Sequence, residues 1–350
     1  MGKKPGCSKS LCFLFMYIGL LSCDQVQEGY SDEFVEDTVT LAFYNLENLF
    51  DPVDDTANQG DDEFLPEAKK EWTRTRYQTK LNNLGRVIRA MQFPAVLGVA
   101  EVENEQVLQD LVSVSDMKEQ AYSTVHFQTD EYRGIEVALL YRKNAFRVLE
   151  MNSHSVNFPD KPYYRTRDIL QVKGILENID TLQLFIVHFP SRSGGLEETE
   201  PLRMLAAERV NRLVQIYADQ GMPSLIMGDF NDEPFDKSLM EVLEAGPIVT
   251  KDSFGLMNPF WEPAALGEGS YKFRGQWQML DQIIFNNDLL DDKGYQYIDG
   301  SAQVFNRSWL LQQEGRYAGY PSRTYAGDQY LGGFSDHLPV MLQLATTERK

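Results

Sequence analysis

The chain has 350 residues, of which 43% are hydrophobic and 12% aromatic, which is enough to bury a sizeable core. Its formal net charge of −19 repels phosphate backbones at long range and so argues against a tight, non-specific nucleic-acid binder. A phosphoester substrate is still permitted, because a bound divalent cation and local arginines can reverse the field inside a cleft.

The first residues predict an export signal. Three lysines precede an uncharged stretch, residues 11–22, which is too short to span a bilayer and suits a signal peptide. It ends in LLSC, which resembles a bacterial lipobox with Cys23 as the lipidated residue; an ordinary secretory signal is the alternative. We expect a lipoprotein signal peptide over residues 1–22 and a protein anchored by its lipid to the periplasmic or cell-surface side of a bacterial envelope.

The next stretch predicts a tether followed by a single domain. Residues 24–38 carry six acids and no base, so we expect a solvated tether over residues 23–38. All three cysteines lie in or at the end of the predicted leader, so we expect the exported chain to fold without a disulfide. No linker rich in Gly or Ser divides residues 39–345, which predicts one α/β domain.

From Val39 onward, strands alternate with helices. Tyr77, Leu81, Leu84 and Ile88 recur at spacings of three and four, which predicts a helix over residues 72–91 with one buried stripe. A second helix is predicted over 203–221. Strands are predicted from Val39 and over 94–100, 137–142, 181–189, 224–230, 278–285 and 337–344. Their alternating polarity predicts sheets with one face on a core, and no phosphate-binding glycine loop follows any strand.

Polar side chains stand where five of these strands open into loops. They are Asn45 and Glu47, Glu101 and Glu103, His188, Asp229 and Asn231, and Asp336 and His337. Taken singly, each is explained by a turn or a helix cap, but together they occupy the positions at which sites tend to form. Asp281 lies inside an apolar strand and needs a partner to offset its desolvation. Such carboxylates and amides suit a hard ion such as Mg²⁺, whereas a thiol cluster or HExxH motif for zinc is missing.

Seven motifs in order carry a family resemblance: YNLENLF, LGVAEVEN, RGIEVALLYR, VHFPSRSGG, MGDFNDEPF, MLDQIIF and GGFSDHLPV. Together they resemble the endonuclease/exonuclease/phosphatase superfamily of DNase I-like metallohydrolases, from about Val39 to Leu344. The resemblance implies a four-layer α/β/β/α sandwich, in which two packed mixed β-sheets are flanked by helices. It places the site at one end of the sheets.

The resemblance also implies a role for each motif residue. Glu101, Asn45 and Asp336 would hold Mg²⁺, with Mn²⁺ or Ca²⁺ as alternatives. His337 would be the catalytic histidine, paired with Asp281. Asp229 and Asn231 would position the nucleophilic water and the phosphate, and His188 would be the second histidine. Water would be deprotonated either by Asp229 or by His337; the acid that orients His188 is left open, with Glu136 as a candidate.

Two further features concern the substrate. Arg165, Arg167 and Arg192 are candidates to bind phosphate, with ordinary surface arginines as the alternative. The aromatic stretch 309–334 is expected either to form one wall of a substrate pocket or to pack for stability.

The predicted function is a Mg²⁺-dependent phosphoester hydrolase that acts outside the cytoplasm as a monomer. A nuclease or phosphodiesterase, with nucleic acid as a candidate substrate, ranks first. A phosphomonoesterase acting on sugar, inositol or nucleotide phosphates is the alternative. A different class of function, a non-catalytic surface lipoprotein that binds a ligand, is the remaining alternative. The complete set of motif residues argues against it.

Overall fold

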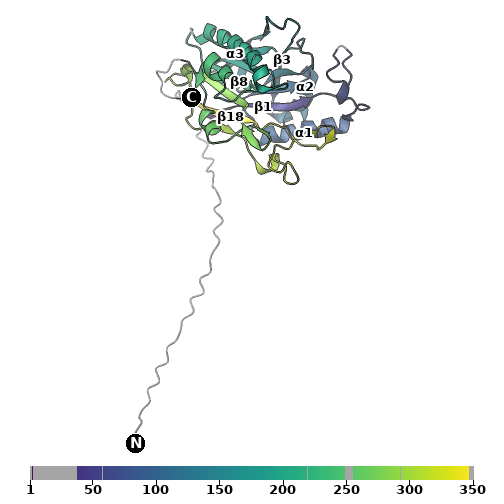
Figure 1. The fold of residues 1–350 in the computed structure, drawn as a ribbon. Helices are drawn as coiled ribbons and strands as arrows, with labels where there is room; N and C mark the ends of the chain where they lie inside the picture. The colour runs from purple at the N-terminus through teal and green to yellow at the C-terminus, as the bar shows by residue number, and fades with distance from the viewer. Residues whose placement is uncertain are drawn as a thin grey trace. The chain divides into compact units, whose positions relative to one another are not determined.

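The structure is a computed structural model that describes residues 2, 38–56, 58–218, 220–248, 255–291 and 293–346. The predicted signal peptide, Cys23 and the tether lie outside these residues, apart from Gly2 and Thr38. Within the described ranges, none of the helices combines the length and the apolar character needed to cross a membrane. The chain from Thr38 onward is built on two β-sheets of seven strands each (Figure 1).

The first sheet is centred on the N-terminal strand of the domain. In spatial order its strands are β14 (Tyr295–Tyr297), β18 (Val340–Thr346), β1 (Thr38–Leu49), β2 (Val96–Val102), β4 (Glu136–Arg142) and β3 (Tyr122–His126), with β15 (Gln303–Val304) also paired to β18. β1 runs parallel to β2 and antiparallel to β18, so the sheet is mixed. The two ends of the domain therefore meet at the middle of one sheet.

The second sheet is also mixed. In spatial order its strands are β5 (Phe146–His154), β6 (Ile169–Leu176), β7 (Asp180–His188), β8 (Ser224–Asp229), β13 (Asp281–Asn286), β10 (Leu256–Met257) and β9 (Ala245–Gly246). β7 is parallel to β8, and β13 is antiparallel to β8. Two small hairpins lie outside both sheets: β11 (Tyr271–Phe273) with β12 (Gln276–Gln278), and β16 (Tyr325–Ala326) with β17 (Gln329–Tyr330).

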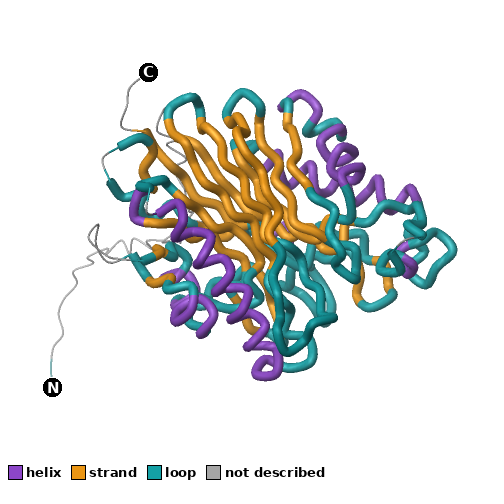
Figure 2. The backbone as a smooth tube through the Cα atoms, turned by 90° about the horizontal axis from the view of Figure 1, so that it is seen from above, coloured by secondary structure: helices purple, strands orange, loops and turns teal. Residues whose placement is uncertain are grey.

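The helices cover the outer faces of the sheets, as the view in Figure 2 shows. The α-helices are α1 (Arg74–Ala90), α2 (Glu105–Ser113), α3 (Leu196–Ala218) and the short α4 (Trp261–Ala265). Shorter 3₁₀ or π turns are η1 (Asp62–Phe64), η2 (Lys118–Gln120), η3 (Ser238–Val242), η4 (Asn287–Leu289) and η5 (Ser308–Leu310). α1 buries its predicted stripe, and Thr73 caps it by accepting a hydrogen bond from the Arg76 amide. α3 begins seven residues earlier than predicted, and Gly221 follows its end at a φ of 62°.

Three hydrophobic clusters show how the layers pack. Between the sheets, Phe43 of β1 belongs to one cluster with Met227 of β8 and Ile283 of β13. On the outer face of the first sheet, residues of α1 and α2 cluster with Tyr44 and Val99. On the outer face of the second sheet, α3 packs against strands β7, β8 and β13. Two packed mixed sheets with helices outside them give the sandwich that the motif resemblance implied, so that prediction is confirmed.

Candidate active site

Three neighbouring strands of the second sheet place polar side chains in one row. Asp229, the last residue of β8, lies opposite Asp281, the first residue of β13. On its other side Asp229 lies opposite His188, the last residue of β7. Residues in register on adjacent strands point to the same face of a sheet, so the register alone brings the three side chains together. All three are buried.

The first sheet adds Asn45 of β1. Its Nδ2 donates a hydrogen bond of 3.1 Å to Oδ2 of Asp229, while its Oδ1 accepts one from the Glu47 amide at 2.9 Å. The carboxamide is thereby fixed in orientation and joins the two sheets across the core. The predicted convergence of the Asn45 and Asp229 motifs is present in the structure.

His337 completes the row from the segment that precedes β18. Its Nδ1 lies 2.6 Å from Oδ2 of Asp281, and its Nε2 lies 3.8 Å from Oδ2 of Asp229. Ser335 accepts a hydrogen bond from the His337 amide and donates one to the Asn45 carbonyl, which ties this segment to β1. The predicted pair of His337 and Asp281 is therefore formed, with the imidazole held between two carboxylates.

Glu101 reaches the site through a bulge in β2. Its φ is 61°, and the register between β2 and β4 shifts between Ala100 and Val102. A bulge redirects a side chain that would otherwise follow the pleat, and such strained positions gather at functional sites. Its Oε2 accepts a hydrogen bond from the Asn48 amide, and its charge contributes to the raised pKa of Asp229.

Asp336 stands beside His337 and is held by Arg323, whose guanidinium donates to Oδ2 at 2.8 Å. Its charge acts on the pKa of both His337 and Glu47. Asp336 and Glu101 are half-buried, so their carboxylates retain access to solvent.

The donor set suits a hard divalent cation. Among the described residues, Asp229, Asp281 and His337 offer ligand atoms that all lie within 4.8 Å of one another, whereas the predicted ligands Glu101 and Asp336 do not belong to this group. Oδ1 of Asp281 is buried and has no hydrogen-bond partner. Oxygen ligands dominate, and Mg²⁺ needs only one or two protein carboxylates besides water and substrate. The site thus contains an acidic group that can bind a divalent metal.

The protonation states differ between the two histidines. Burial lowers the pKa of His337, but the charges of Asp281 and Asp229 outweigh burial and hold the pKa well above its usual value. Burial and the charges of Arg167 and Arg133 hold the pKa of His188 well below its usual value. Burial also raises the pKa of Asp229 to about 7. In the site without a metal, these surroundings favour the charged form of His337 and the neutral form of His188.

A second buried pair, absent from the predicted site, lies beside it. Nζ of Lys80 is 3.6 Å from Oε2 of Glu47 and donates hydrogen bonds to Thr324 and to the Phe334 carbonyl. Glu47 also accepts a hydrogen bond from the Thr324 amide. Helix α1 thus holds the segment that carries Arg323 and Asp336. A lysine within the apolar stripe of the predicted helix is a sequence feature that could have marked Lys80 as unusual, although it does not identify the partner.

The remaining predicted residues have other surroundings. Asn231, at a φ of 50°, donates its amide N–H to Asp229 and its side-chain N–H to the Phe189 carbonyl, so it shapes the turn after β8. Glu136 accepts its hydrogen bonds from Thr129, while Nδ1 of His188 is buried without a hydrogen-bond partner. The candidate pairing of Glu136 with His188 is thus not formed; Nε2 of His188 lies 3.5 Å from Asp229 instead.

The three predicted phosphate-binding arginines differ in their partners. Arg192 is occupied by Asp232 and Asp236, and exposed Arg165 donates to the carbonyls of Pro162 and Tyr164. Arg167 is buried, donates to the Phe189 carbonyl and affects His188 through its charge. The Nε and Nη2 atoms of Arg192 are occupied by the protein itself, so Arg192 lacks the free fork that phosphate binding requires, whereas the two hydrogen bonds of Arg165 come from Nη1 alone.

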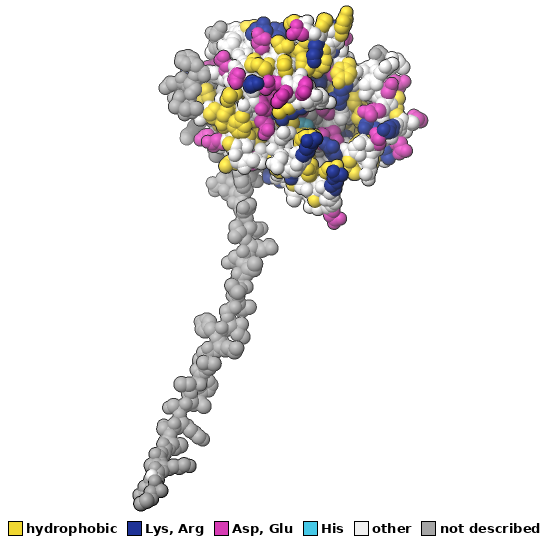
Figure 3. All heavy atoms as spheres, in the orientation of Figure 1, with side chains coloured by type: hydrophobic (Ala, Val, Ile, Leu, Met, Phe, Trp, Pro, Cys, Tyr) yellow, Lys and Arg dark blue, Asp and Glu magenta, His cyan; other side chains and the backbone are white. Residues whose placement is uncertain are grey.

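A cavity of about 850 Å³ adjoins the site. One wall comes from residues 312–329, within the aromatic stretch, and the other from the β11–β12 hairpin. Tyr317 and Tyr320 line it, whereas Trp309 and Tyr325 pack against other aromatic rings, so both predicted uses of the stretch occur. On the face seen in Figure 3, Lys and Arg side chains gather below the centre, apart from a group of Asp and Glu side chains above them.

Comparison with known proteins supports the assignment that the motifs suggested. The model described as "Endonuclease/Exonuclease/phosphatase family" matches residues 40–346. No curated protein matches the chain.

Solved structures share the fold at low sequence identity. TDP2 of D. rerio, complexed with single-strand DNA product, has a TM-score of 0.55 and 14% identity, over 89% of this chain and 100% of that one. The mannosyl-6-phosphatase Bt3783 of Bacteroides thetaiotaomicron VPI-5482 has a TM-score of 0.51 and 15% identity, over 88% and 99%. A further family protein from Bacteroides thetaiotaomicron has a TM-score of 0.52 and 16% identity, over 90% and 100%. With its sandwich of two sheets and its complete motif set, this chain belongs to the endonuclease/exonuclease/phosphatase family of phosphoester-hydrolysing enzymes.

Proposed function

We propose that this enzyme is a Mg²⁺-dependent nuclease or phosphodiesterase that acts outside the cytoplasm. The observation that carries the proposal is the single carboxylate of Asp229, placed between Asn45, His188 and the His337–Asp281 pair. One carboxylate surrounded by two histidines and an amide provides both a proton acceptor and donors for a phosphate oxygen. The structural similarity to D. rerio TDP2, solved with single-strand DNA product, supports a diester substrate.

The protonation state of each residue suggests its role in the reaction. Asp229 accepts a proton from the attacking water, and Asn45 holds the carboxylate in place through its 3.1 Å hydrogen bond. The imidazolium of His337, kept charged by Asp281, stabilises the negative charge that develops on the phosphate. Glu101, Asp336 and Asn45 would hold the metal, which would supply positive charge for the negatively charged phosphate. As the oxygen of the water bonds to phosphorus, the bond from phosphorus to the leaving oxygen breaks and that oxygen takes a proton from water. Neutral His188 orients the phosphate or the leaving oxygen.

The proposed location rests on the leader. Its lysines, its apolar stretch and the LLSC sequence that ends in Cys23 support export and lipid anchoring on the periplasmic or cell-surface side. The enzyme would then meet its substrate outside the cytoplasm as a monomer, held to the membrane by lipid alone.

A phosphomonoesterase is the second candidate, supported by the structural similarity to the mannosyl-6-phosphatase of Bacteroides thetaiotaomicron VPI-5482. Hydrolysis of bis-p-nitrophenyl phosphate and of p-nitrophenyl phosphate, each with Mg²⁺ and with EDTA, separates the two. Faster Mg²⁺-dependent turnover of the diester supports the first proposal. Faster turnover of the monoester replaces it with the second, and no turnover with any divalent metal refutes both.

Substitutions test the assigned groups. His337→Ala should lower kcat/KM for the diester by about a thousandfold, because it removes the imidazolium beside the phosphate. Asp281→Asn should lower it by about a hundredfold or more, because the charge of His337 loses its support. His154→Ala, a histidine on β5 outside the site, is the matched control and should keep wild-type activity. Full activity of His337→Ala, with an unchanged far-UV spectrum, would refute the assignment.

A further inference from the structure

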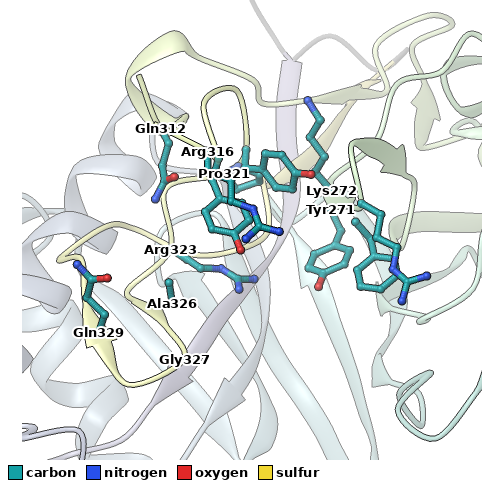
Figure 4. A pocket seen from close by; sticks show the side chains of 13 residues that line it. Tyr271, Lys272, Gln312, Arg316, Pro321, Arg323, Ala326, Gly327 and Gln329 are labelled. Carbon is teal, nitrogen blue, oxygen red and sulfur yellow. The ribbon is translucent and has the colours of Figure 1, made fainter. Parts of the chain in front are cut away.

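The cavity beside the site has a charge opposite to that of the protein. Its lining includes Lys272, Arg274, Arg316 and Arg323, and no Asp or Glu among the described residues (Figure 4). The whole chain carries 52 acids and 33 bases, so a cavity lined by four cations and no acid is a marked local reversal. Such a reversal concentrates an anion where the surrounding surface repels it.

Three of these cations are available to a ligand. In the part of the chain that the structure describes, Lys272, Arg274 and Arg316 form no ion pair with an acidic side chain. Lys272 donates to the Gly319 carbonyl, and Arg316 lies 5.5 Å from the ring centroid of its neighbour Tyr317. Arg323 differs, because it is paired with Asp336 and points across the cavity toward Tyr271 (Figure 4).

Flat aromatic faces line the same cavity. Tyr317 and Tyr320 pack edge to face at 5.5 Å, and Lys272 lies over the ring of Tyr320 at 5.1 Å. Tyr271 and Phe273 stand on the opposite wall, on strand β11. Aromatic side chains interleaved with cations are the combination that binds an unstacked base together with its phosphate.

The cavity opens directly beside the reacting groups. The rings of Tyr271 and His337 lie 4.8 Å apart, and their backbones form an isolated bridge. On the other side, Arg323 links the cavity wall to Asp336 at 2.8 Å. A volume of about 850 Å³ falls in the range of small-molecule sites and is far too small for a duplex.

We propose that this cavity binds one unpaired nucleotide of the substrate next to the scissile phosphoester. Its base stacks on the tyrosines, and its phosphate, the second anionic group of the substrate, is held by Lys272 and Arg316. The inference rests on the proposed phosphoester hydrolysis and narrows its substrate to single-stranded or short oligonucleotides. A duplex keeps its bases paired and stacked, so it would not fill the cavity.

Binding can be tested without turnover. Adenosine 3′,5′-bisphosphate is titrated calorimetrically into the enzyme in EDTA, with adenosine, inorganic phosphate and a sugar phosphate as separate probes. The bisphosphate should bind wild type at least about tenfold more tightly than any other probe. A Lys272→Met, Arg316→Gln double variant should bind it at least about tenfold more weakly. Arg307→Gln is the matched control, since Arg307 is also exposed and lies over a neighbouring ring, that of Phe305, outside the cavity.

Kinetics separate this inference from the proposed function. In the double variant, kcat/KM for a short oligothymidylate should fall about tenfold more than kcat/KM for bis-p-nitrophenyl phosphate, which has no second phosphate. An equal fall for both substrates, equal binding of the bisphosphate by wild type and double variant, or tighter binding of the sugar phosphate would overturn the inference. Absence of all hydrolysis in wild type would overturn the proposed function, and calorimetry would still decide whether the cavity binds a nucleotide.

Discussion

Asp229 shows why a costly arrangement of charges is kept at this site. Its carboxylate is buried and is near Asp281 and Glu101, so burial and both charges raise its pKa. Asn45 and the two histidines offset only part of that cost. A protein under selection for stability alone would replace such a group by an apolar one. The cluster is therefore better explained by chemistry than by folding.

Glu136, opposite Val102 on the neighbouring strand, permits a test of a buried carboxyl that is not itself a predicted metal ligand. Only 1% of it is exposed, and burial raises its pKa from 4.5 to about 7. The unfolded chain loses this proton near pH 4.5 and the folded chain only near pH 7. The stability due to this group is therefore complete at the lower pH and is lost as the pH rises toward about 7. Glu136→Gln should weaken that pH dependence of the free energy of unfolding by up to about 3 kcal/mol.

Urea unfolding of wild type and Glu136→Gln at pH 4.5 and pH 8 measures this difference. Glu150→Gln, an exposed acid on β5, is the control and should keep the wild-type pH dependence. The explanation fails if Glu136→Gln retains the full wild-type slope.

At the residue scale, much of the candidate site could be predicted from strand ends. Asn45, Asp229, Asp281 and His337 lie close together in the structure, as the motif resemblance implied. Lys80 could not be assigned, because its partner lies more than thirty residues away, on a different element. The acidic partners of Arg192 could not be predicted either, since Asp232 and Asp236 are brought close to it only by the fold.

At the element scale, the site depends on the distance between the two packed sheets. Gly98 of β2 faces the second sheet, and a Cβ there would lie 2.7 Å from Sδ of Met227 and 3.1 Å from the Phe43 ring. Gly98→Ala should therefore lower the free energy of unfolding by about 1–3 kcal/mol through overpacking. Chemical denaturation measures the loss. Gly246→Ala, where a Cβ would meet nothing within 4 Å, should change stability little.

A double-mutant cycle shows whether the loss comes from this contact. Met227→Val shortens the opposing side chain, so Gly98→Ala combined with it should cost less than the sum of the two single changes. Additive costs would show that the two sheets adjust in some other way.

Elements with a strong apolar period were predicted well, and irregular ones were not. The helix over 72–91 is observed as α1, because its stripe is both periodic and capped. The β11–β12 hairpin, which forms a wall of the cavity, was missed, since three-residue strands have too little pattern to be recognised. The bulge at Glu101 was missed as well, because nothing in the neighbouring sequence indicates that a glutamate will have a positive φ.

At the scale of the whole molecule, the order of the strands is the part that sequence could not predict. β8 pairs with β13 across more than fifty residues, and β1 pairs with β18 across nearly the whole domain. Apolar pattern states which strands are buried but not which are neighbours. The family resemblance supplied that information, and it is the reason the four-layer architecture was anticipated.

The last strand of the domain, β18, closes the first sheet by pairing with the first strand, β1. β18 pairs with β1 at six positions and also with β14 and β15, so it lies inside the first sheet rather than at its edge. Val340, Leu342 and Leu344 belong to the core between the sheets.

A chain that stops after Leu338 loses these contacts and leaves the edge of β1 unpaired, so it should show no cooperative unfolding in urea. A chain that stops after Thr346 is the control and should unfold as the full chain does. Because Asp336 and His337 precede β18 directly, a peptide of residues 339–350 added to the truncated chain should restore folding and hydrolysis together. If the shorter chain unfolded cooperatively at the wild-type midpoint, β18 would be dispensable, and the joining of the domain's two ends would not be what holds the site.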